Sequence, residues 1–185
     1  MTLWFTADQH FSHPRIIEYC NRPFRTVDEM DKRLIENYNT KVADEDDVYF
    51  IGDLTMKGPE NKGYVERLVS KLRGRKYFVV GNHDRLRVWD YIDMGFITAA
   101  SRIDWPHENV TLHHDPAIQH TLPKDRYLYC GHVHGLFKIC KRVINVGVDV
   151  WDYFPVSSAQ LYDLVYQEVV SKEQMGWLKE NNYTE

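Results

Sequence analysis

The chain has 185 residues, of which 43% are hydrophobic and 27% charged, and its formal net charge is −4. This composition is ordinary for one globular domain with a packed core and argues against intrinsic disorder. The net acidity gives no general electrostatic footprint for nucleic acid, which is therefore not the favoured partner, although a local basic patch stays open. No apolar run approaches a membrane span, and the N-terminus lacks the pattern of a secretory signal, so we expect no membrane partner.

The cysteines give a prediction about location. Cys20, Cys130 and Cys140 show no paired spacing, and their odd number argues against a disulfide framework. A reducing compartment is the simplest setting for such a chain, so we expect a cytoplasmic protein.

Strands and helices alternate through the first half of the chain. An apolar run predicts a buried strand over residues 3–7, and Pro14 can open a helical turn. Thr26 and Glu29 have the spacing of a capping box, which predicts a helix starting there. Further apolar patterns predict strands over 47–51 and 76–80 and helices over 64–72 and 86–94.

Strands dominate the second half. The pattern predicts strands over residues 96–103, 109–112 and 126–130, then a hairpin or two adjacent strands over 136–140 and 142–148. Ser157 or Ser158 can cap a last helix. Without repeats or linkers, the order of elements predicts one α/β domain over residues 1–171, with helices covering sheet faces, and a polar tail or short docked helix over 172–185.

Five of the predicted strands end in polar residues of one narrow kind. These are Asp8 with His10, Asp53, Asn82 with His83 and Asp84, His113 with His114, and His132 with His134. Functional groups of an open α/β sheet gather beyond the carboxyl ends of its strands, so we expect these side chains to converge. Each one alone has a simpler explanation as a turn or a hydrogen-bonded core residue, but all five together are improbable as accidents.

The residue types predict the kind of ligand. Carboxylates, imidazoles and an amide oxygen without cysteine suit divalent ions such as Mn, Fe, Zn, Ni or Co. The set is too large for one tetrahedral ion, but it suits two ions about 3.5–4 Å apart that share a carboxylate. Such a pair can deprotonate a bridging water and polarise phosphoryl oxygens, which predicts hydrolysis of a phosphate ester.

The strand ends together resemble the motifs of the calcineurin-like metallophosphoesterase superfamily, in that family's order. The matching motifs are Asp8-Gln9-His10, Gly52-Asp53, Gly81-Asn82-His83-Asp84, His113-His114 and Gly131-His132-Val133-His134. The resemblance implies a four-layer αββα sandwich of two mixed β-sheets with flanking helices, of the small cap-less bacterial or phage type. It implies one metal held by Asp8, His10, Asp53 and His134, and a second held by Asp53, Asn82, His114 and His132.

The same resemblance assigns the remaining polar residues. His83 would face the scissile phosphate as general acid, and Asp84 is grouped with it as a helper in the following turn. The family pattern Leu-x-His-x-Pro selects His114 as the ligand, and His113 is the alternative. Met56 stands where many relatives have the aspartate that orients the catalytic histidine, so the partner of His83 is unassigned.

Basic residues near these motifs are candidates for substrate contact. Lys57 stands where many relatives have arginine, and it can contact phosphate as a point charge. His13 and Arg85 are the other expected contacts, and Arg15 and Arg22 could also line the site. The simpler alternative is that these charges belong to solvated loops.

The function predicted from these features is hydrolysis of a phosphate ester, preferentially a phosphodiester that is nucleotide-like or another small diester. The reaction would use a metal-bridging hydroxide, with His83 as acid. One alternative is a catalytically quiet binding module on the same fold, although such proteins usually lack the His83-type residue. The other is a nuclease or an end-processing phosphatase of nucleic acid.

Overall fold

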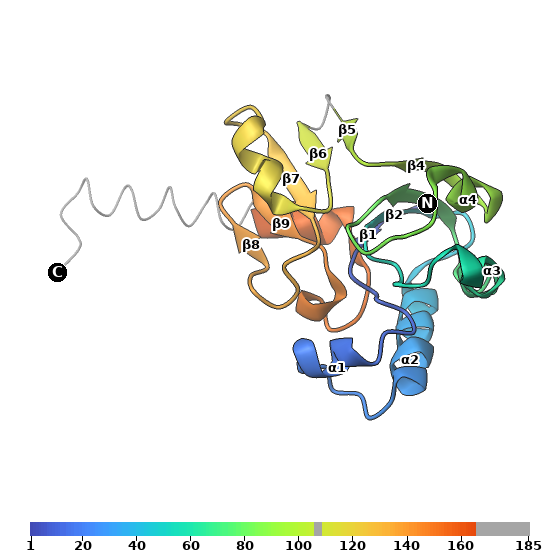
Figure 1. Ribbon diagram of the computed structural model, residues 1–185. Coiled ribbons are helices and arrows are strands. Elements are labelled where there is room, and N and C mark those ends of the chain that lie inside the picture. The colour runs from blue at the N-terminus through green and yellow to red at the C-terminus, as the bar shows by residue number, and fades with distance from the viewer. Residues whose placement is uncertain (106–108, 166–185) are drawn as a thin grey trace, which may run out of the picture.

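The strands form two five-stranded mixed sheets in the computed structural model, which describes residues 1–105 and 109–165 (Figure 1). The first sheet has the order β10-β1-β2-β3-β4. Its strands are β1 (Leu3–Thr6), β2 (Asp47–Ile51), β3 (Arg75–Val79), β4 (Phe96–Ala100) and β10 (Val156–Ser157). Strands β1 to β4 are parallel and β10 is antiparallel to β1. The carboxyl ends of the four parallel strands therefore share one edge.

The second sheet has the order β5-β6-β7-β9-β8. Its strands are β5 (Ile103–Trp105), β6 (Val110–Leu112), β7 (Tyr127–Cys130), β8 (Ile139–Cys140) and β9 (Val143–Asn145). Strands β6, β7 and β9 are parallel, with β5 and β8 antiparallel at the two edges.

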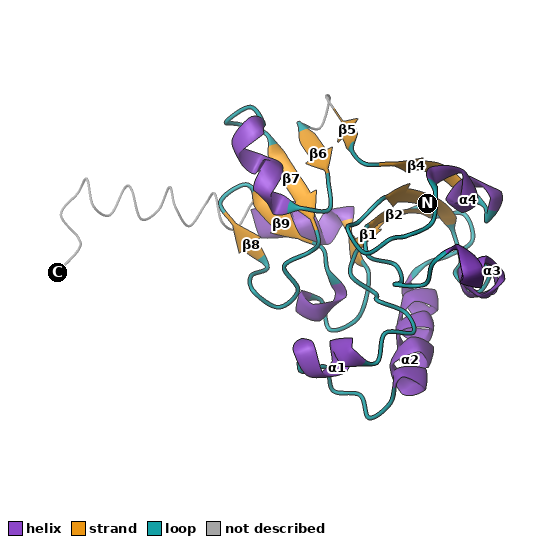
Figure 2. Cartoon of the chain, in the orientation of Figure 1, coloured by secondary structure: helices purple, strands orange, loops and turns teal. Residues whose placement is uncertain are grey.

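The helices lie mainly on the outer faces of the sheets (Figure 2). They are α1 (Arg15–Tyr19), α2 (Val27–Lys41), α3 (Lys62–Val69), α4 (Val88–Asp93), the 3₁₀ segments η1 (Pro59–Asn61), η2 (Pro116–Thr121) and η3 (Val148–Val150), and a helix from residue 158. Thr26 caps α2 by accepting a hydrogen bond from the Glu29 amide, as its sequence predicts. In the described part of the chain, no helix is long and apolar enough to cross a membrane.

Three clusters of buried residues separate the four layers. Alternate side chains of β2 enter different clusters: Phe50 packs against α2 and α3, whereas Ile51 packs between the sheets. A smaller cluster that includes Leu128 lies under η2 on the outer face of the second sheet. This period-2 alternation buries both faces of each sheet and confirms the αββα sandwich.

Several predicted boundaries were wrong. The single strand predicted over residues 96–103 is interrupted, because β4 pairs in the first sheet and β5 in the second. The helix predicted over 64–72 ends at Val69, and the strand β10 was missed because it is only two residues long. The hairpin predicted over residues 136–148 is confirmed as the antiparallel pair of β8 with β9, although both strands are shorter than predicted. The predicted tail, residues 172–185, lies outside the described residues.

Candidate metal centre

The segments after β1 and β2 continue side by side beyond the ends of their strands. The amide of Asp8 donates to the carbonyl of Gly52 at 3.1 Å, and the amide of His10 donates to that of Asp53 at 3.0 Å. This continued parallel pairing brings Asp8 and His10 next to Asp53. All three are buried, at no more than 1% exposure.

The second sheet completes the cluster. The amide of His132 donates to both carboxylate oxygens of Asp8 at 3.0 Å. Nε2 of His114 lies 3.2 Å from Oδ2 of Asp53, and it lies 3.0 Å from Oδ1 of Asn82. Nδ1 of His132 lies 2.9 Å from the same Asn82 oxygen. The cluster therefore lies where the strand ends of the two sheets meet.

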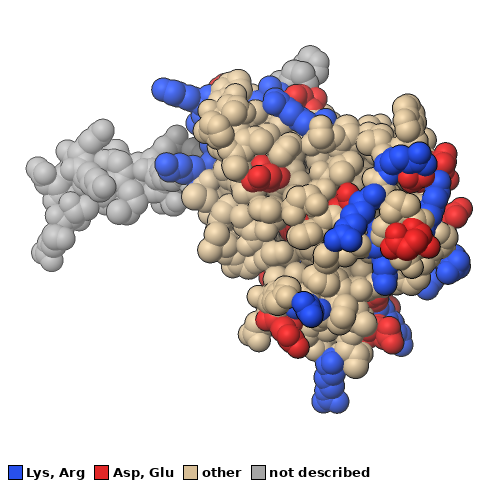
Figure 3. Space-filling view, in the orientation of Figure 1, with Lys and Arg blue, Asp and Glu red and all other residues tan. Residues whose placement is uncertain are grey.

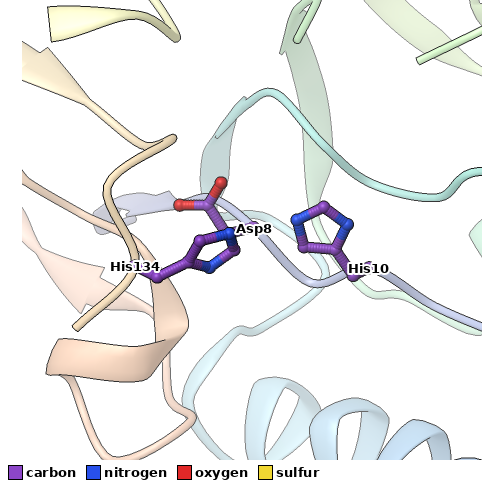
Figure 4. A group of neighbouring side chains, drawn as sticks. All are labelled: Asp8, His10 and His134. Atoms are coloured by element: carbon purple, nitrogen blue, oxygen red, sulfur yellow. The ribbon is translucent and has the colours of Figure 1, made fainter. Parts of the chain in front are cut away.

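Three groups of potential metal ligands overlap here: two consist of predicted ligands only, and the third joins His134 to Cys20 and Asp149. Atoms of Asp8, His10 and His134 lie within 4.8 Å of one another, and Figure 4 shows His134 approaching from a segment far from the other two. Atoms of Asp8, Asp53 and His114 form the second group within the same distance. Oδ2 of Asp53 is 3.5 Å from Nε2 of His10 and 3.2 Å from Nε2 of His114, so one carboxylate oxygen lies between the two groups.

The imidazole of His10 fits a metal ligand. Both of its ring nitrogens are buried, and neither has a hydrogen-bond partner among the described residues. Burial lowers the pKa of His10 to about 3, which keeps the ring neutral and its lone pair available. For Asp53, burial raises the pKa, but the hydrogen bond and charge of His114 lower it to about 2, so the carboxylate is ionised. Neutral imidazole and ionised carboxylate are the forms that bind divalent transition metals.

Five of the predicted ligands have a left-handed backbone, which non-glycine residues rarely adopt. Their φ angles are 59° for Asp8, 52° for His10, 56° for Asp53, 73° for His132 and 47° for His134. Each such residue costs on the order of 1 kcal/mol or more, so surrounding contacts must hold it in place. Concentration of these conformations in one cluster points to a site selected for function rather than for stability.

Glycines let the strand ends approach the carboxylates closely. A Cβ at Gly131 would lie 2.7 Å from Oδ2 of Asp8, and a Cβ at Gly81 would overlap the carboxylate of Asp53. Any larger side chain at either position would displace a predicted ligand.

Arg22 and Asp149 form a buried ion pair next to this cluster, which was not predicted from the sequence. Oδ2 of Asp149 accepts a hydrogen bond from Nδ1 of His134 at 2.9 Å. Arg22 donates to both oxygens of Asp149, at 2.8 and 2.9 Å, and to the carbonyl oxygens of Asp8 at 2.7 Å and Gln9 at 3.0 Å. Burial lowers the pKa of His134, but the hydrogen bond to Asp149 outweighs it and raises the pKa to about 10. Arg22 therefore holds the backbone beside the site in place. Because its side chain is fully buried, it does not line the site, contrary to the prediction.

Asn145 is a second supporting residue that was missed. Its side-chain amide donates to the carbonyl oxygens of His134 at 2.6 Å and Phe137 at 2.9 Å, and its oxygen accepts from the Gly147 amide. The sequence did carry a signal, because Asn145 stands within an apolar run. An asparagine buried there needs hydrogen-bond partners inside the protein.

Asp84 holds the turn rather than facing the open side of the site. Its carboxylate accepts hydrogen bonds from the amides of Asp53, Gly81 and Leu54 at 2.8 to 3.0 Å. Burial raises the pKa of Asp84 to about 6. The side chain thus ties the segment after β2 to the one after β3.

His83 lies at the edge of the cluster. Its amide donates to Oδ1 of Asp53 at 2.9 Å, and the centre of its ring lies 5.6 Å from that of His10. Among the described residues, no side chain hydrogen-bonds to the His83 ring. Met56 lines the same cleft as His83, so the position where relatives have an orienting carboxylate is occupied by a thioether.

The predicted substrate contacts are only partly brought together. His13 lines an open cleft of about 740 Å³ that also contains His10, His83 and His134. Lys57 is not part of this lining, and its ammonium group lies 5.9 Å from the ring centre of Tyr64. Arg85 is exposed and likewise lies outside the lining. His114 rather than His113 adjoins Asp53, while His113 hydrogen-bonds within its own turn at Asp115.

The fold and the cluster define a class of protein: an αββα sandwich with a carboxylate–imidazole site where its two sheets meet. Residues 1–180 match the family model described as calcineurin-like phosphoesterase, and the chain belongs to that family. The family typically binds two metal ions, and the candidate groups described above are of the right kind.

Relatives of similar length are known in archaea and phages. The chain is 36% identical over 175 residues to an uncharacterized protein of Methanocaldococcus jannaschii, covering 88% of this chain and 90% of that one. It is 28% identical over 194 residues to the gene 66 protein of Mycobacterium phage L5, covering 88% and 93% of the two chains. A crystal structure of a protein of unknown function from Aquifex aeolicus aligns with a TM-score of 0.69 and 25% identity, covering 88% of this chain and 98% of that one.

Proposed function

We propose that the protein hydrolyses phosphodiesters with the help of two divalent transition-metal ions. The observation that carries this proposal is the position of Asp53. One of its oxygens lies 3.5 Å from a nitrogen of His10 and 3.2 Å from one of His114, as expected for a carboxylate shared between two ions. Membership of a phosphoesterase family supports the same reaction class.

The residues divide into two ligand sets around the shared Asp53. Asp8, His10 and His134 would complete one set, and Asn82, His114 and His132 would complete the other. When bound, the two ions would polarise the phosphoryl oxygens and make a water molecule acidic enough to attack phosphorus. Asp84 and Arg22 keep the ligand-bearing segments in place through their backbone hydrogen bonds.

His83 is the proposed general acid. Its amide donates a hydrogen bond to Asp53, so the imidazole lies beside the proposed metal ligands without being one of them. A proton on its ring would pass to the leaving oxygen as the P–O bond breaks. The adjoining cleft is open, which favours a diester with two substituents over a small enclosed monoester.

Turnover of bis(4-nitrophenyl) phosphate by the metal-loaded protein tests this function. We expect hydrolysis stimulated by Mn²⁺ or Ni²⁺, and a roughly 10²- to 10⁴-fold loss of kcat in His83→Ala because the proton donor is removed. Metal content measured by mass spectrometry should stay unchanged in that variant, since His83 is not a ligand. His120→Ala, an exposed histidine outside the cluster, is the matched control and should retain full activity.

Metal-loaded protein without turnover on a panel of monoesters and diesters would not be a phosphoesterase. A binding module on this fold would then be the better explanation, although all seven predicted ligands and His83 are present.

A further inference from the structure

The cleft beside the metal centre has more apolar surface than binding of a phosphate requires. Its lining includes His10, His83 and His134, which belong to the proposed site. The remaining lining includes Ile16, Tyr19, Met56, Val133 and Leu136. Phosphate is recognised by charged and polar groups, so these apolar side chains would contact an apolar part of the ligand.

Two of these side chains are unusually exposed for their type. Tyr19 on α1 is 67% exposed, and Leu136 in the segment between β7 and β8 is 77% exposed. Single exposed apolar residues are common on protein surfaces. Here, however, two separate segments contribute one each to the same cleft, and the surface between α1 and β8 is mostly uncharged in Figure 3.

Aromatic rings form a continuous series from the rim of this cleft to the metal ligands. The ring centres of Tyr19 and His13 are 6.3 Å apart, those of His13 and His10 are 5.6 Å apart, and those of His10 and His134 are 5.1 Å apart. A planar group placed along this series could stack on a ring while its attached phosphate reached the metal site.

Polar groups without partners lie along the same path. Arg15 lines the cleft and forms no ion pair with any residue in the described ranges. Nδ1 of His13 is buried and lacks a hydrogen-bond partner within the same part of the chain. This nitrogen is therefore free to exchange a hydrogen bond with a ligand. An anionic ligand with a planar, weakly polar body could pair with Arg15 and hydrogen-bond to His13.

We infer that this cleft binds the nucleobase of a nucleotide ester whose phosphate lies at the metal centre. The base would pack between Tyr19 and Leu136, and Arg15 would offset the charge of the phosphate side. This inference rests on the proposed function, because it takes the phosphate position from the metal site. A sugar phosphate or an aliphatic diester would leave the apolar walls of the cleft exposed to water.

Binding of two matched ligands tests the inference without relying on turnover. The probes are the methyl-esterified, non-hydrolysable phosphonate analogues of AMP and of 1-deoxyribose 5-phosphate, which differ only by the base, titrated calorimetrically into Mn²⁺-loaded protein. We expect the AMP analogue to bind roughly tenfold more tightly, since stacking of one base on an aromatic side chain is worth that much or more. Tyr19→Ala and Leu136→Ser should each reduce this ratio severalfold without changing affinity for the ribose analogue.

Trp89→Ala is the matched control, because Trp89 is 74% exposed on α4 and lies outside the lining of the cleft. It should keep the wild-type ratio. Equal affinity for the two analogues, failure of both to bind, or a wild-type ratio in the Tyr19/Leu136 double variant would overturn the inference. Hydrolysis of bis(4-nitrophenyl) phosphate separates failure of this inference from failure of the proposed function. A protein that hydrolyses it but binds the two analogues equally keeps the proposed function and loses only the nucleotide specificity.

Discussion

Buried charges around the ligands illustrate how single residues shape the site. Asp149 accepts a hydrogen bond from Nδ1 of His134 and so fixes the orientation of that ring. Arg22 neutralises Asp149 and at the same time donates to two carbonyl oxygens of the left-handed segment after β1. The same guanidinium thus helps to orient a ligand from each sheet.

Replacement of Asp149 tests this positioning role. In Asp149→Asn we expect affinity for the first Mn²⁺ ion to fall roughly 10- to 100-fold, because the amide is a poorer acceptor for the His134 N–H. The measurement is calorimetric titration with Mn²⁺, alongside circular dichroism to verify folding. Asp152→Asn, an exposed neighbour, is the control and should bind as the wild type does. Unchanged Mn²⁺ affinity in Asp149→Asn would mean that His134 needs no such partner.

At the scale of elements, α2 both covers the first sheet and secures the site. Met30 and Leu34 pack into the cluster beneath the helices. Asp31, on the same helix, accepts hydrogen bonds from the amide of Ser12 at 3.0 and 3.1 Å. Because Ser12 is itself left-handed and two residues beyond His10, the position of α2 bears directly on that ligand.

The cap of α2 gives a prediction at this scale. Thr26→Ala removes the acceptor for the Glu29 amide and should lower the free energy of unfolding by about 1 kcal/mol. For a chain of this length this corresponds to a Tm roughly 2–4 °C lower, measured by calorimetry. Thr40→Ala, in the last turn of the same helix, should change stability by less than about 0.5 kcal/mol. Equal effects of the two substitutions would show that the cap contributes nothing specific.

At the scale of the whole molecule, the two sheets share one ligand cluster. His114 and His132 follow strands of the second sheet, whereas Asp53 and Asn82 follow strands of the first. Ions bound between them would connect the sheets as well as hold substrate. Metal binding should therefore stabilise the complete fold against unfolding.

Thermal unfolding with and without metal tests this connection. At a free Mn²⁺ concentration 100 times Kd, one site should add about 2.7 kcal/mol of stability and raise Tm by several degrees relative to protein in EDTA. His114→Ala should lose much of this increase because it removes a proposed ligand, whereas His113→Ala should retain it. The reverse result would identify His113 as the ligand, and no increase in the wild type would contradict a metal site between the sheets.

Much of this site could be predicted from the sequence because its chemistry is local. A polar residue directly after an apolar strand is visible in the chain, and parallel strands bring such residues to one edge of the sheet. Asp8, His10 and Asp53 were predicted in this way and do lie together with His114, which the family pattern selected over His113. The family resemblance extended this to the sandwich fold, since its motifs occur in order along the chain.

Pairs of residues distant in sequence could not be predicted. Arg22 and Asp149 are 127 positions apart, and neither position carries a local pattern that names the other as its partner. The same limit applies to Lys57 and Arg85, whose charges were visible but whose distance from the cleft depends on how loops pack. Likewise, Tyr19 and Leu136 line the same cleft only because α1 and the segment after β7 both border it.

The sequence by itself therefore determined which side chains occur at the strand ends, and with them which groups are available as metal ligands. Only the tertiary structure decided which nitrogen of each histidine faces a carboxylate, which charges are buried as supports, and which apolar residues border the site. The physical reason is that ligand identity depends on covalent order along one strand, whereas orientation, burial and cleft shape depend on contacts between segments that fold together from distant parts of the chain.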